Sequence, residues 1–334
     1  MDAIVSAAYE VLTAPSYPST MRVLAVGACA LAAAALSGAS SSSTPPALLT
    51  YAISFRSPGN PSGPLNGRIC LAYPDGTRAV RALSKGWYRE PAWSPGGRYL
   101  AYSRQTTNRE RKQLHNGPVY EVFLATARGR VIRNLSKGTS VFNMDPAWSP
   151  DGRRLAFTSA YHQSIISVVS RKGGSPYTVA VGATPAWTPD GARILFSAYD
   201  GIASVHPDGP PDRKLIVPGA TAPALSPDGT KLAYIRRTPN GTDSDVFVSN
   251  ADGTGERRLT DSPEGEWGPT WSPDGSLIAF TRYSDEPGTD REWVTVVRSD
   301  SGHEYATVRG PHSAFDPSWR RPVNLPQAKR SRCF

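Results

Sequence analysis

The chain has 334 residues with a net charge of +9, and glycine and proline make up 61 of them, or 18%, against roughly 12% in average proteins. Because both residues interrupt helix interiors, this excess excludes a helical bundle, and it is too evenly spread for a collagen or a disordered linker. With 39% hydrophobic residues and eight tryptophans for a core, the composition predicts a folded, turn-rich, mostly β protein.

Residues 1–39 resemble a secretory signal peptide. Met21-Arg22 precedes an apolar run from Val23 to Leu36, and small residues follow as far as Ala39. A basic residue, a short apolar core and small residues at a cleavage site are typical of such signals, and this run is too short to span a bilayer comfortably. We expect cleavage near Ala39 and export to the periplasm, the cell envelope or the exterior. Residues 1–20 fit the pattern poorly, so Met21 is an alternative start.

The three cysteines leave two questions open. The segment that ends at Cys29 resembles a lipobox, which would make Cys29 a lipidated N-terminus, but the apolar run continues beyond it and favours simple cleavage. In an exported protein Cys70 and Cys333 could form a disulfide. The alternative is one buried thiol and one exposed thiol in the tail.

Beyond a Ser/Pro-rich linker at residues 40–47, the chain repeats itself. A Pro-x-Trp-Ser-Pro-Asp-Gly theme and its close variants start at Pro91, Pro146, Pro185, Pro223 and Pro269, with a truncated copy at Pro317. The aromatic position advances by 55, 39, 38, 46 and 48 residues, and it holds Trp in every copy except the one with Leu225. A period of this length is typical of propellers and other repeat arrays.

Each complete copy predicts a hairpin. The Ser-Pro-Asp-Gly segment has the chemistry of a turn, and the short apolar or alternating runs that follow it predict strands at 99–103, 155–159, 194–197, 232–235 and 277–281. A second hairpin follows in each unit, with first strands at 69–73, 120–125, 165–170, 202–205, 246–250 and 294–298. Four strands in about 40–50 residues describe one propeller blade.

The two ends of the array are complementary. Residues 48–56 form a second strand with no first strand ahead of it, and residues 317–321 supply a first strand with nothing after it. Pairing of these two strands would complete a blade and leave no free sheet edge at the junction. We therefore predict that residues 48–323 form an all-β, six-bladed β-propeller of four-stranded antiparallel blades, closed by pairing of the C-terminal strand with the N-terminal blade.

The repeats resemble a known family. The Pro-x-Trp-Ser-Pro-Asp-Gly hairpin, together with a downstream strand such as that in residues 246–260, is similar to the WD-like Pro-Asp (PD40) repeat of TolB-type propellers. The resemblance covers about residues 48–321 and implies the fold, with cell-envelope assembly or transport as the setting. Such repeats also occur beside several enzyme domains, so the motif says little about function. TolB itself carries an extra N-terminal α/β domain, for which the residues between Ala39 and Leu48 are too few.

One face of the predicted propeller carries loops of variable length and chemistry, which is where binding usually occurs on a rigid scaffold. The residue before each repeat's proline should line the channel mouth on that face: Glu90, Asp145, Thr184, Ala222, Gly268 and Asp316. Closure would make Asp316, Glu90 and Asp145 neighbours. This acidic side suits a cation, an amine or a basic peptide segment; the alternative is that the carboxylates bind nearby backbone N–H groups.

Aromatic residues expected on the same face form a second candidate set. Exposed aromatic side chains favour protein or carbohydrate contacts, although some of these would pack between blades. The set is Trp87, Tyr88, Phe142, Tyr161, Tyr199, Trp267 and Phe315.

Signatures of catalysis are scarce. The five histidines include no His-x-x-x-His or His-Glu-x-x-His spacing, and the sequence has no Gly-x-Ser-x-Gly, no sialidase Asp box and no glycine-rich phosphate loop. The remaining metal candidates are three loop histidines, His115, His162 and His312, which could converge as in propeller-type oligogalacturonate lyases. We predict no cofactor, apart from a cation that the acidic channel mouth could hold.

Basic residues concentrate only near the C-terminus, where residues 324–334 form a basic tail, which we interpret as solvated rather than as a nucleic-acid arm. The sequence therefore predicts an exported, non-enzymatic scaffold that binds a protein or peptide partner in the cell envelope, with no membrane span and no nucleic acid. The alternative is a metal-assisted glycan lyase or hydrolase that acts in the channel mouth.

Overall fold

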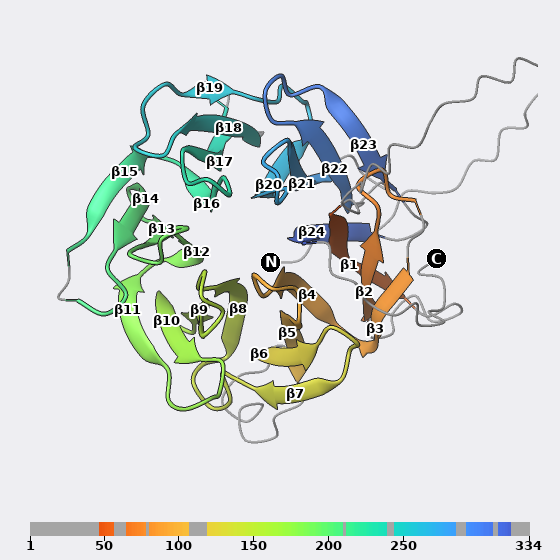
Figure 1. Cartoon of the computed structure of the whole chain (residues 1–334), viewed down its shortest axis with the longest axis vertical. Coiled ribbons are helices and arrows are strands. Elements are labelled where there is room, and N and C mark those ends of the chain that lie inside the picture. The colour runs from red at the N-terminus through yellow and green to blue at the C-terminus, as the bar shows by residue number, and fades with distance from the viewer. Residues whose placement is uncertain are drawn as a thin grey trace, which may run out of the picture. The chain divides into compact units, whose positions relative to one another are not determined.

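The computed structural model describes residues 47–56, 65–77, 80–106, 119–209, 212–238, 244–284, 292–309 and 313–321. Every described residue belongs to one compact unit of the chain, within residues 44–334. This part of the chain contains strands and no helix (Figure 1), and it therefore includes no helix long and apolar enough to cross a membrane. The predicted signal peptide, nearly all of the linker and the basic tail lie outside the described residues, as do Cys29, His115, His312 and Cys333.

The strands form antiparallel sets of four. One sheet joins both ends of the described chain, in the order β24 (Ser313–Arg320), β1 (Leu48–Arg56), β2 (Leu65–Ala72) and β3 (Val80–Gly86). A second sheet has the order β12 (Ala183–Trp187), β13 (Ile194–Ala198), β14 (Gly201–Val205) and β15 (Lys214–Pro218). A third has the order β16 (Thr221–Leu225), β17 (Lys231–Arg237), β18 (Ser244–Asn250) and β19 (Arg257–Arg258). A fourth has the order β20 (Gly265–Trp271), β21 (Leu277–Tyr283), β22 (Glu292–Arg298) and β23 (Glu304–Val308).

The remaining two sets touch each other. They are β4 (Tyr88–Trp93), β5 (Tyr99–Thr106), β6 (Val119–Thr126) and β7 (Val131–Asn134), and then β8 (Phe142–Trp148), β9 (Arg154–Ala160), β10 (Ser164–Ser170) and β11 (Tyr177–Val181). A single parallel residue pair, Tyr120 with Phe142, links β6 to β8 and makes one eight-stranded sheet where separate four-stranded sheets were predicted. The stacked rings of Tyr120 and Phe142, 6.3 Å apart, hold the two strand ends together.

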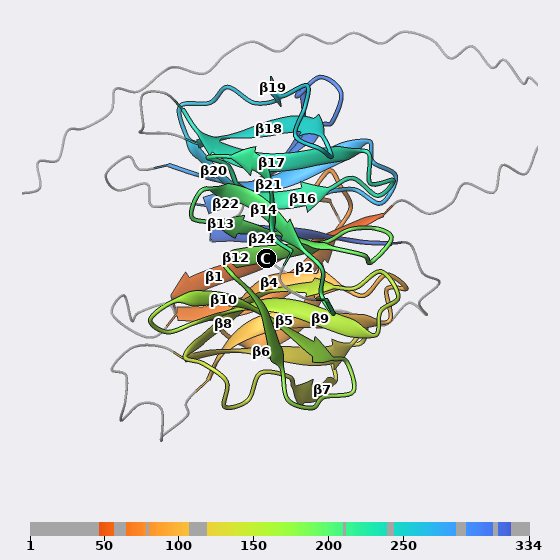
Figure 2. The ribbon, with the colours of Figure 1, turned by 90° about the vertical axis from the view of Figure 1, so that its left-hand side faces the viewer.

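The sets are arranged around a common centre. Figure 1 shows the first strand of each set nearest the centre and the fourth strand on the outside, and Figure 2 shows the strands running between the same two faces of the unit. The central strands are β24, β4, β8, β12, β16 and β20. The Ser-Pro-Asp-Gly turns follow these strands and therefore share one face, which we call the turn face. The connections between sets occupy the opposite face, the loop face.

The predicted turns are present, and their side chains close them. In one copy the Ser149 hydroxyl donates to Asp151 Oδ1 at 2.6 Å, the same Oδ1 accepts the Arg153 N–H at 2.9 Å, and Gly152 takes φ 66°. These bonds favour the carboxylate and lower the pKa of Asp151, with the Ser149 hydroxyl as the main cause. The same bonding recurs around Asp190, Asp228 and Asp274.

The repeated tryptophans connect neighbouring sets. The indole N–H of Trp148 donates to the carbonyl of Ala92, that of Trp271 to Ala224, and that of Trp319 to Thr270, at 2.9–3.1 Å. Each acceptor immediately precedes the equivalent aromatic position of the preceding set. A second aromatic series, on the second strands, is fully buried: Tyr51, Tyr102, Phe157, Phe196, Tyr234 and Phe280. Both series fill the space between sheets, so packing between sets makes up most of the core.

The sequence left open whether Cys70 is a free thiol or part of a disulfide. It lies fully buried in β2 and is disulfide-bonded, so the alternative of a free buried thiol is wrong. Its partner cysteine lies outside the described residues.

Candidate functional site

The central strands line a cavity of about 360 Å³. All six residues that precede the repeats' prolines lie on its wall: Glu90, Asp145, Thr184, Ala222, Gly268 and Asp316. The five that are not glycine have φ between 47° and 53°, and they are the only non-glycine residues of the described chain with positive φ. Left-handed backbone is costly for such residues, so surrounding contacts must hold it.

A β-bulge accompanies this conformation. The pairing between β4 and β5 shifts register between Arg89 and Ala92, and β8 and β9 shift between Met144 and Ala147. A bulge leaves its extra residue outside the ladder and redirects that residue's side chain. The backbone N–H at the left-handed position therefore needs another acceptor, and each non-glycine copy finds one on the preceding set.

Carboxylates supply this acceptor on one side of the cavity. Asp316 Oδ2 accepts the Glu90 N–H at 3.2 Å, and Glu90 Oε2 accepts the Asp145 N–H at 3.1 Å. The three acidic residues are therefore neighbours on consecutive central strands, and two of them bind backbone N–H groups in the way that the alternative sequence hypothesis described.

Hydroxyl groups supply the acceptor elsewhere. Thr158 Oγ1 accepts the Thr184 N–H at 3.0 Å while its hydroxyl donates to Asp145 Oδ2 at 2.8 Å. Ser197 Oγ accepts the Ala222 N–H at 2.8 Å, and Thr281 Oγ1 accepts the Asp316 N–H at 2.9 Å. The N–H groups of Glu90 and Asp145 are thus bound by carboxylates, and those of Thr184, Ala222 and Asp316 by hydroxyl groups.

Arg89 is a residue that sequence reasoning missed. Its Nε lies 3.3 Å from Asp316 Oδ2 and 3.5 Å from Glu90 Oε1, and its guanidinium lies 5.3 Å from the centre of the Phe315 ring. Asp316 is the main cause that raises the pKa of Arg89. In a regular strand Arg89 and Glu90 would point to opposite faces, so only the left-handed Glu90 backbone brings them together. The Arg89 guanidinium therefore forms ion pairs with the carboxylates of both Asp316 and Glu90.

The carboxylates of the cavity carry more negative charge than Arg89 neutralises. Burial, followed by repulsion from Asp145 and Asp316, raises the pKa of Glu90 to about 8. Burial is also the main cause that raises the pKa of Asp145 and that of the nearby Glu292. Because a buried cluster of like charges favours the protonated forms, the cavity carries less negative charge near neutral pH than its formal count of carboxylates.

Three predicted aromatic residues are well exposed. Trp267 lines the central cavity with 42% of its surface exposed, and Tyr161 and Tyr199 are 51% and 98% exposed. Trp87 and Phe142 are half-buried, and both lie against the Tyr120 ring. The candidate aromatic surface therefore consists chiefly of Trp267, Tyr161 and Tyr199.

Two members of the predicted aromatic set do not belong to an exposed surface. Tyr88 is 5% exposed and packs edge-on against Tyr102, and Phe315 is 3% exposed beneath Arg89. Trp267 holds the same repeat position as Phe315 and is exposed, so the neighbouring side chains and not the position in the repeat decide the exposure.

Of the three histidines predicted as candidate metal ligands, only His162 lies within the described residues. His162 is exposed and lies against the ring of Tyr161, with 4.0 Å between the ring centres. Within the described ranges no group of three or more His, Cys, Asp or Glu side chains is arranged to hold a metal ion.

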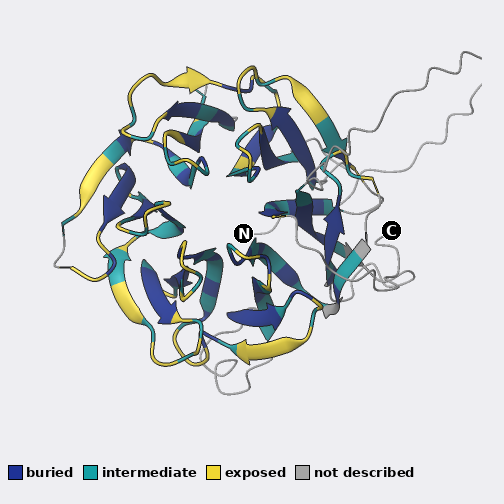
Figure 3. Ribbon diagram, viewed as in Figure 1, coloured by how far each residue is buried: buried dark blue, intermediate teal, exposed yellow. Residues whose placement is uncertain are grey.

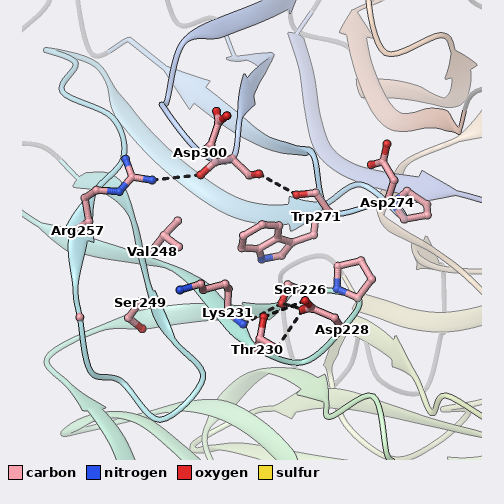
Figure 4. A pocket seen from close by; sticks show the side chains of 15 residues that line it. Ser226, Asp228, Thr230, Lys231, Val248, Ser249, Arg257, Trp271, Asp274 and Asp300 are labelled. Atoms are coloured by element: carbon pink, nitrogen blue, oxygen red, sulfur yellow. Dashed lines mark hydrogen bonds between the residues drawn. The ribbon is translucent and has the colours of Figure 1, made fainter.

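A larger cavity lies on the turn face. It has about 750 Å³ and separates the β16–β19 sheet from the β20–β23 sheet. Figure 4 shows Trp271 at its centre, with Lys231 and Asp228 on one side and Arg257 on the other. Asp228 is bound by Ser226 and Thr230 within its own turn, so this charge is already used in the fold.

The chain was compared with known proteins, and no protein-family model matches it. Dipeptidyl-peptidase 5 of Porphyromonas gingivalis is 39% identical over 70 residues, 20% of this chain and 10% of that protein. An uncharacterised protein of Agrobacterium fabrum is 26% identical over 263 residues, 73% of this chain and 85% of that protein. The Tol-Pal system protein TolB of Zymomonas mobilis is 36% identical over 74 residues, 22% and 15% of the two chains. The chain spans about a tenth of the length of the first two curated relatives, both peptidases by name.

Solved structures give broader matches. TolB from Acinetobacter baumannii superposes with a TM-score of 0.64 at 19% identity, covering 82% of this chain and 66% of that one. A putative TolB from Agrobacterium tumefaciens gives a TM-score of 0.59 at 18% identity, covering 83% and 99%. The four-stranded antiparallel sheets and these neighbours define a β-propeller. The resemblance carried by the Pro-Asp repeats is confirmed, and the chain has the TolB-type propeller fold.

Proposed function

We propose that this chain is a six-bladed propeller, closed by β24 and β1, that acts as an exported, non-enzymatic scaffold and binds a protein or peptide partner at its channel mouth and loop face. The register of β24 on β1, from Leu48 with Arg320 to Ser54 with Ser313, supports the closure. The six repeated sets of four strands support the blade count.

The observation that carries the binding proposal is the uneven channel mouth. Asp316, Glu90 and Asp145 lie together on one side, and Trp267, on β20, exposes 42% of its surface to the same cavity. An acidic side together with an exposed indole suits a partner segment that carries a Lys or Arg beside an apolar side chain, since tryptophan provides both apolar area and a cation–π surface.

The chemistry of the carboxylates supports binding over catalysis. Glu90 and Asp316 already accept backbone N–H groups from neighbouring blades, so their orientation serves the fold.

Two observations support export. The N-terminal sequence has the pattern of a secretory signal, and Cys70 is disulfide-bonded, as is typical of proteins in oxidising compartments. The resemblance to TolB further suggests the cell envelope as the place of action.

Site-specific photocrosslinking tests the proposal. A photoreactive phenylalanine analogue at Trp267 or Tyr199 should give the same discrete protein adducts in intact cells, whereas the analogue at Thr230 on the turn face should give none. A D145K substitution should abolish the Trp267 adducts. Equal adducts from all three positions, or none from the loop face, would contradict the proposed partner site.

A further inference from the structure

The charge of the propeller is divided between its blades. The described residues within 88–181, which include β4 to β11, contain eleven basic and four acidic residues, a net charge of +7. In the described residues of 183–309, which include β12 to β23, fifteen acidic residues exceed eleven basic ones, a net of −4. The mild net charge of the chain therefore conceals two regions of opposite sign.

Six exposed basic side chains gather at the turn face and outer edge of these two blades. We call them the basic patch: Arg98, Arg128, Arg130, Arg133, Arg153 and Lys172. Of the four acidic residues in the same blades, Glu90 and Asp145 lie in the central cavity and Glu121 is buried, which leaves Asp151 as the exposed one. The patch is therefore almost free of opposing charge.

Contacts across the blade boundary make the patch continuous. The Arg133 guanidinium, from β7, donates to the Lys172 carbonyl in the turn after β10. Arg171 lies with its guanidinium 4.7 Å from the ring centre of Tyr99, and its Nε donates to the Gly152 carbonyl at 3.1 Å. Tyr99 follows Arg98, and Gly152 precedes Arg153, so both ends of the patch are held together.

Apolar side chains are exposed beside the basic ones. Val131 and Ile132, on β7 between Arg130 and Arg133, expose 46% and 36% of their surfaces. On β11, Val181 exposes 55%. Figure 3 shows β7 as an exposed strand on the outside of the ring, and β7 pairs only with β6, so nothing in the described structure covers its outer side.

We propose that the basic patch and the exposed aliphatic residues of β7 dock the protein on an anionic lipid bilayer. Arginine and lysine attract phosphate headgroups, and aliphatic side chains between them enter the interface. A soluble polyanion would account for the charges but would gain nothing from Val131 and Ile132. Because the patch lies on the turn face and outer edge, docking leaves the channel mouth open to a partner.

Vesicle co-sedimentation of the full chain tests this inference. We expect binding to phosphatidylcholine vesicles that contain 30% phosphatidylglycerol, no binding to phosphatidylcholine alone, and loss of binding at high salt. Each basic residue near such a surface strengthens binding by roughly fivefold, so R130E/K172E should weaken it by about 25-fold or more. Both side chains are exposed, so their replacement should leave the fold intact.

The matched control is K214E/R237E, which makes the same charge change at exposed positions of β15 and β17. It should bind within about twofold of the unchanged protein. If R130E/K172E still binds as the unchanged protein does, or if K214E/R237E loses as much, the patch is not the docking surface and general charge or the basic tail accounts for binding.

A second variant separates lipid from a soluble polyanion. V131S/I132S should weaken vesicle binding by about threefold or more while leaving heparin and duplex DNA binding unchanged. If V131S/I132S leaves vesicle binding intact, and heparin or DNA competes as tightly as the vesicles, the partner is a polyanion and the lipid proposal is overturned. Circular dichroism and thermal unfolding establish that each variant is folded.

Discussion

The two sides of the channel mouth solve one backbone problem with different chemistry. On β24, β4 and β8 the left-handed positions hold Asp316, Glu90 and Asp145, whereas on β12, β16 and β20 they hold Thr184, Ala222 and Gly268. The backbone is nearly the same in all six, with φ between 47° and 62°. Conformation therefore does not require an acid at these positions, and the acidic side can serve a further purpose.

Removing the shared carboxylate should give the largest effect. D316A leaves the Glu90 N–H and the Arg89 guanidinium without their acceptor in a partly buried site, which should cost about 2–3 kcal/mol of unfolding free energy. Urea unfolding at neutral pH measures this loss. D316N, which keeps an acceptor oxygen, is the control and should lose less; equal losses would mean that shape rather than hydrogen bonding matters here.

A matched change on the neutral side should cost less. S197A removes the acceptor of the Ala222 N–H and the hydroxyl that contacts Thr184, without exposing a charge, so we expect a loss of about 1–2 kcal/mol. The same urea experiment compares it with D316A. A larger loss for S197A than for D316A would reverse the comparison between the two sides.

The neutral side also lacks one tryptophan. Leu225 on β16 takes the position of the repeated indoles, and it lines a cavity of about 530 Å³ between the β12–β15 and β16–β19 sheets. L225W should fill part of this space and raise stability by about 1 kcal/mol, read as a higher melting temperature. A lower melting temperature would show that the neighbouring sheets have adapted to leucine.

The smallest change at neutral pH is expected for E90Q, which keeps an acceptor for the Asp145 N–H. Because the pKa of Glu90 is raised from 4.5 to about 8 in the folded state, the folded state binds the extra proton, and stability falls as pH rises between these values. E90Q should flatten this part of the stability profile and exceed the unchanged protein in stability at pH 9. Parallel profiles for the two proteins from pH 5 to 9 would contradict the raised pKa.

The sequence predicted the repeated elements closely because their signals are local. The Ser-Pro-Asp-Gly turns depend on contacts within six residues, such as Ser149 with Asp151 and Arg154, and the spacing of the copies indicated the blade period. The six positions on the cavity wall were also predicted, since one residue before each proline shares one place in the repeat.

What the sequence did not reveal depends on non-local contacts. Arg89 joins the acidic side only because the Glu90 backbone is left-handed, and the burial of Tyr88 and Phe315 depends on neighbours such as Tyr102 and Arg89. The link between β6 and β8 depends on two rings, Tyr120 and Phe142, that are 22 positions apart in the chain. Residue type alone carries none of this information.

Local sequence thus determined the turns, the strands and the spacing of the repeats, because hydrogen bonding in turns and alternation in strands act over a few residues. The sequence predicted a strand at residues 317–321, whereas β24 spans Ser313–Arg320 and pairs with β1. Tertiary structure decided which charges lie side by side. The excess of basic residues in 88–181 is already present in the sequence, but stacking β4–β7 against β8–β11 gathers Arg98, Arg130, Arg133 and Lys172 on one surface. Charges far apart in sequence combine into one field only when the fold brings them together.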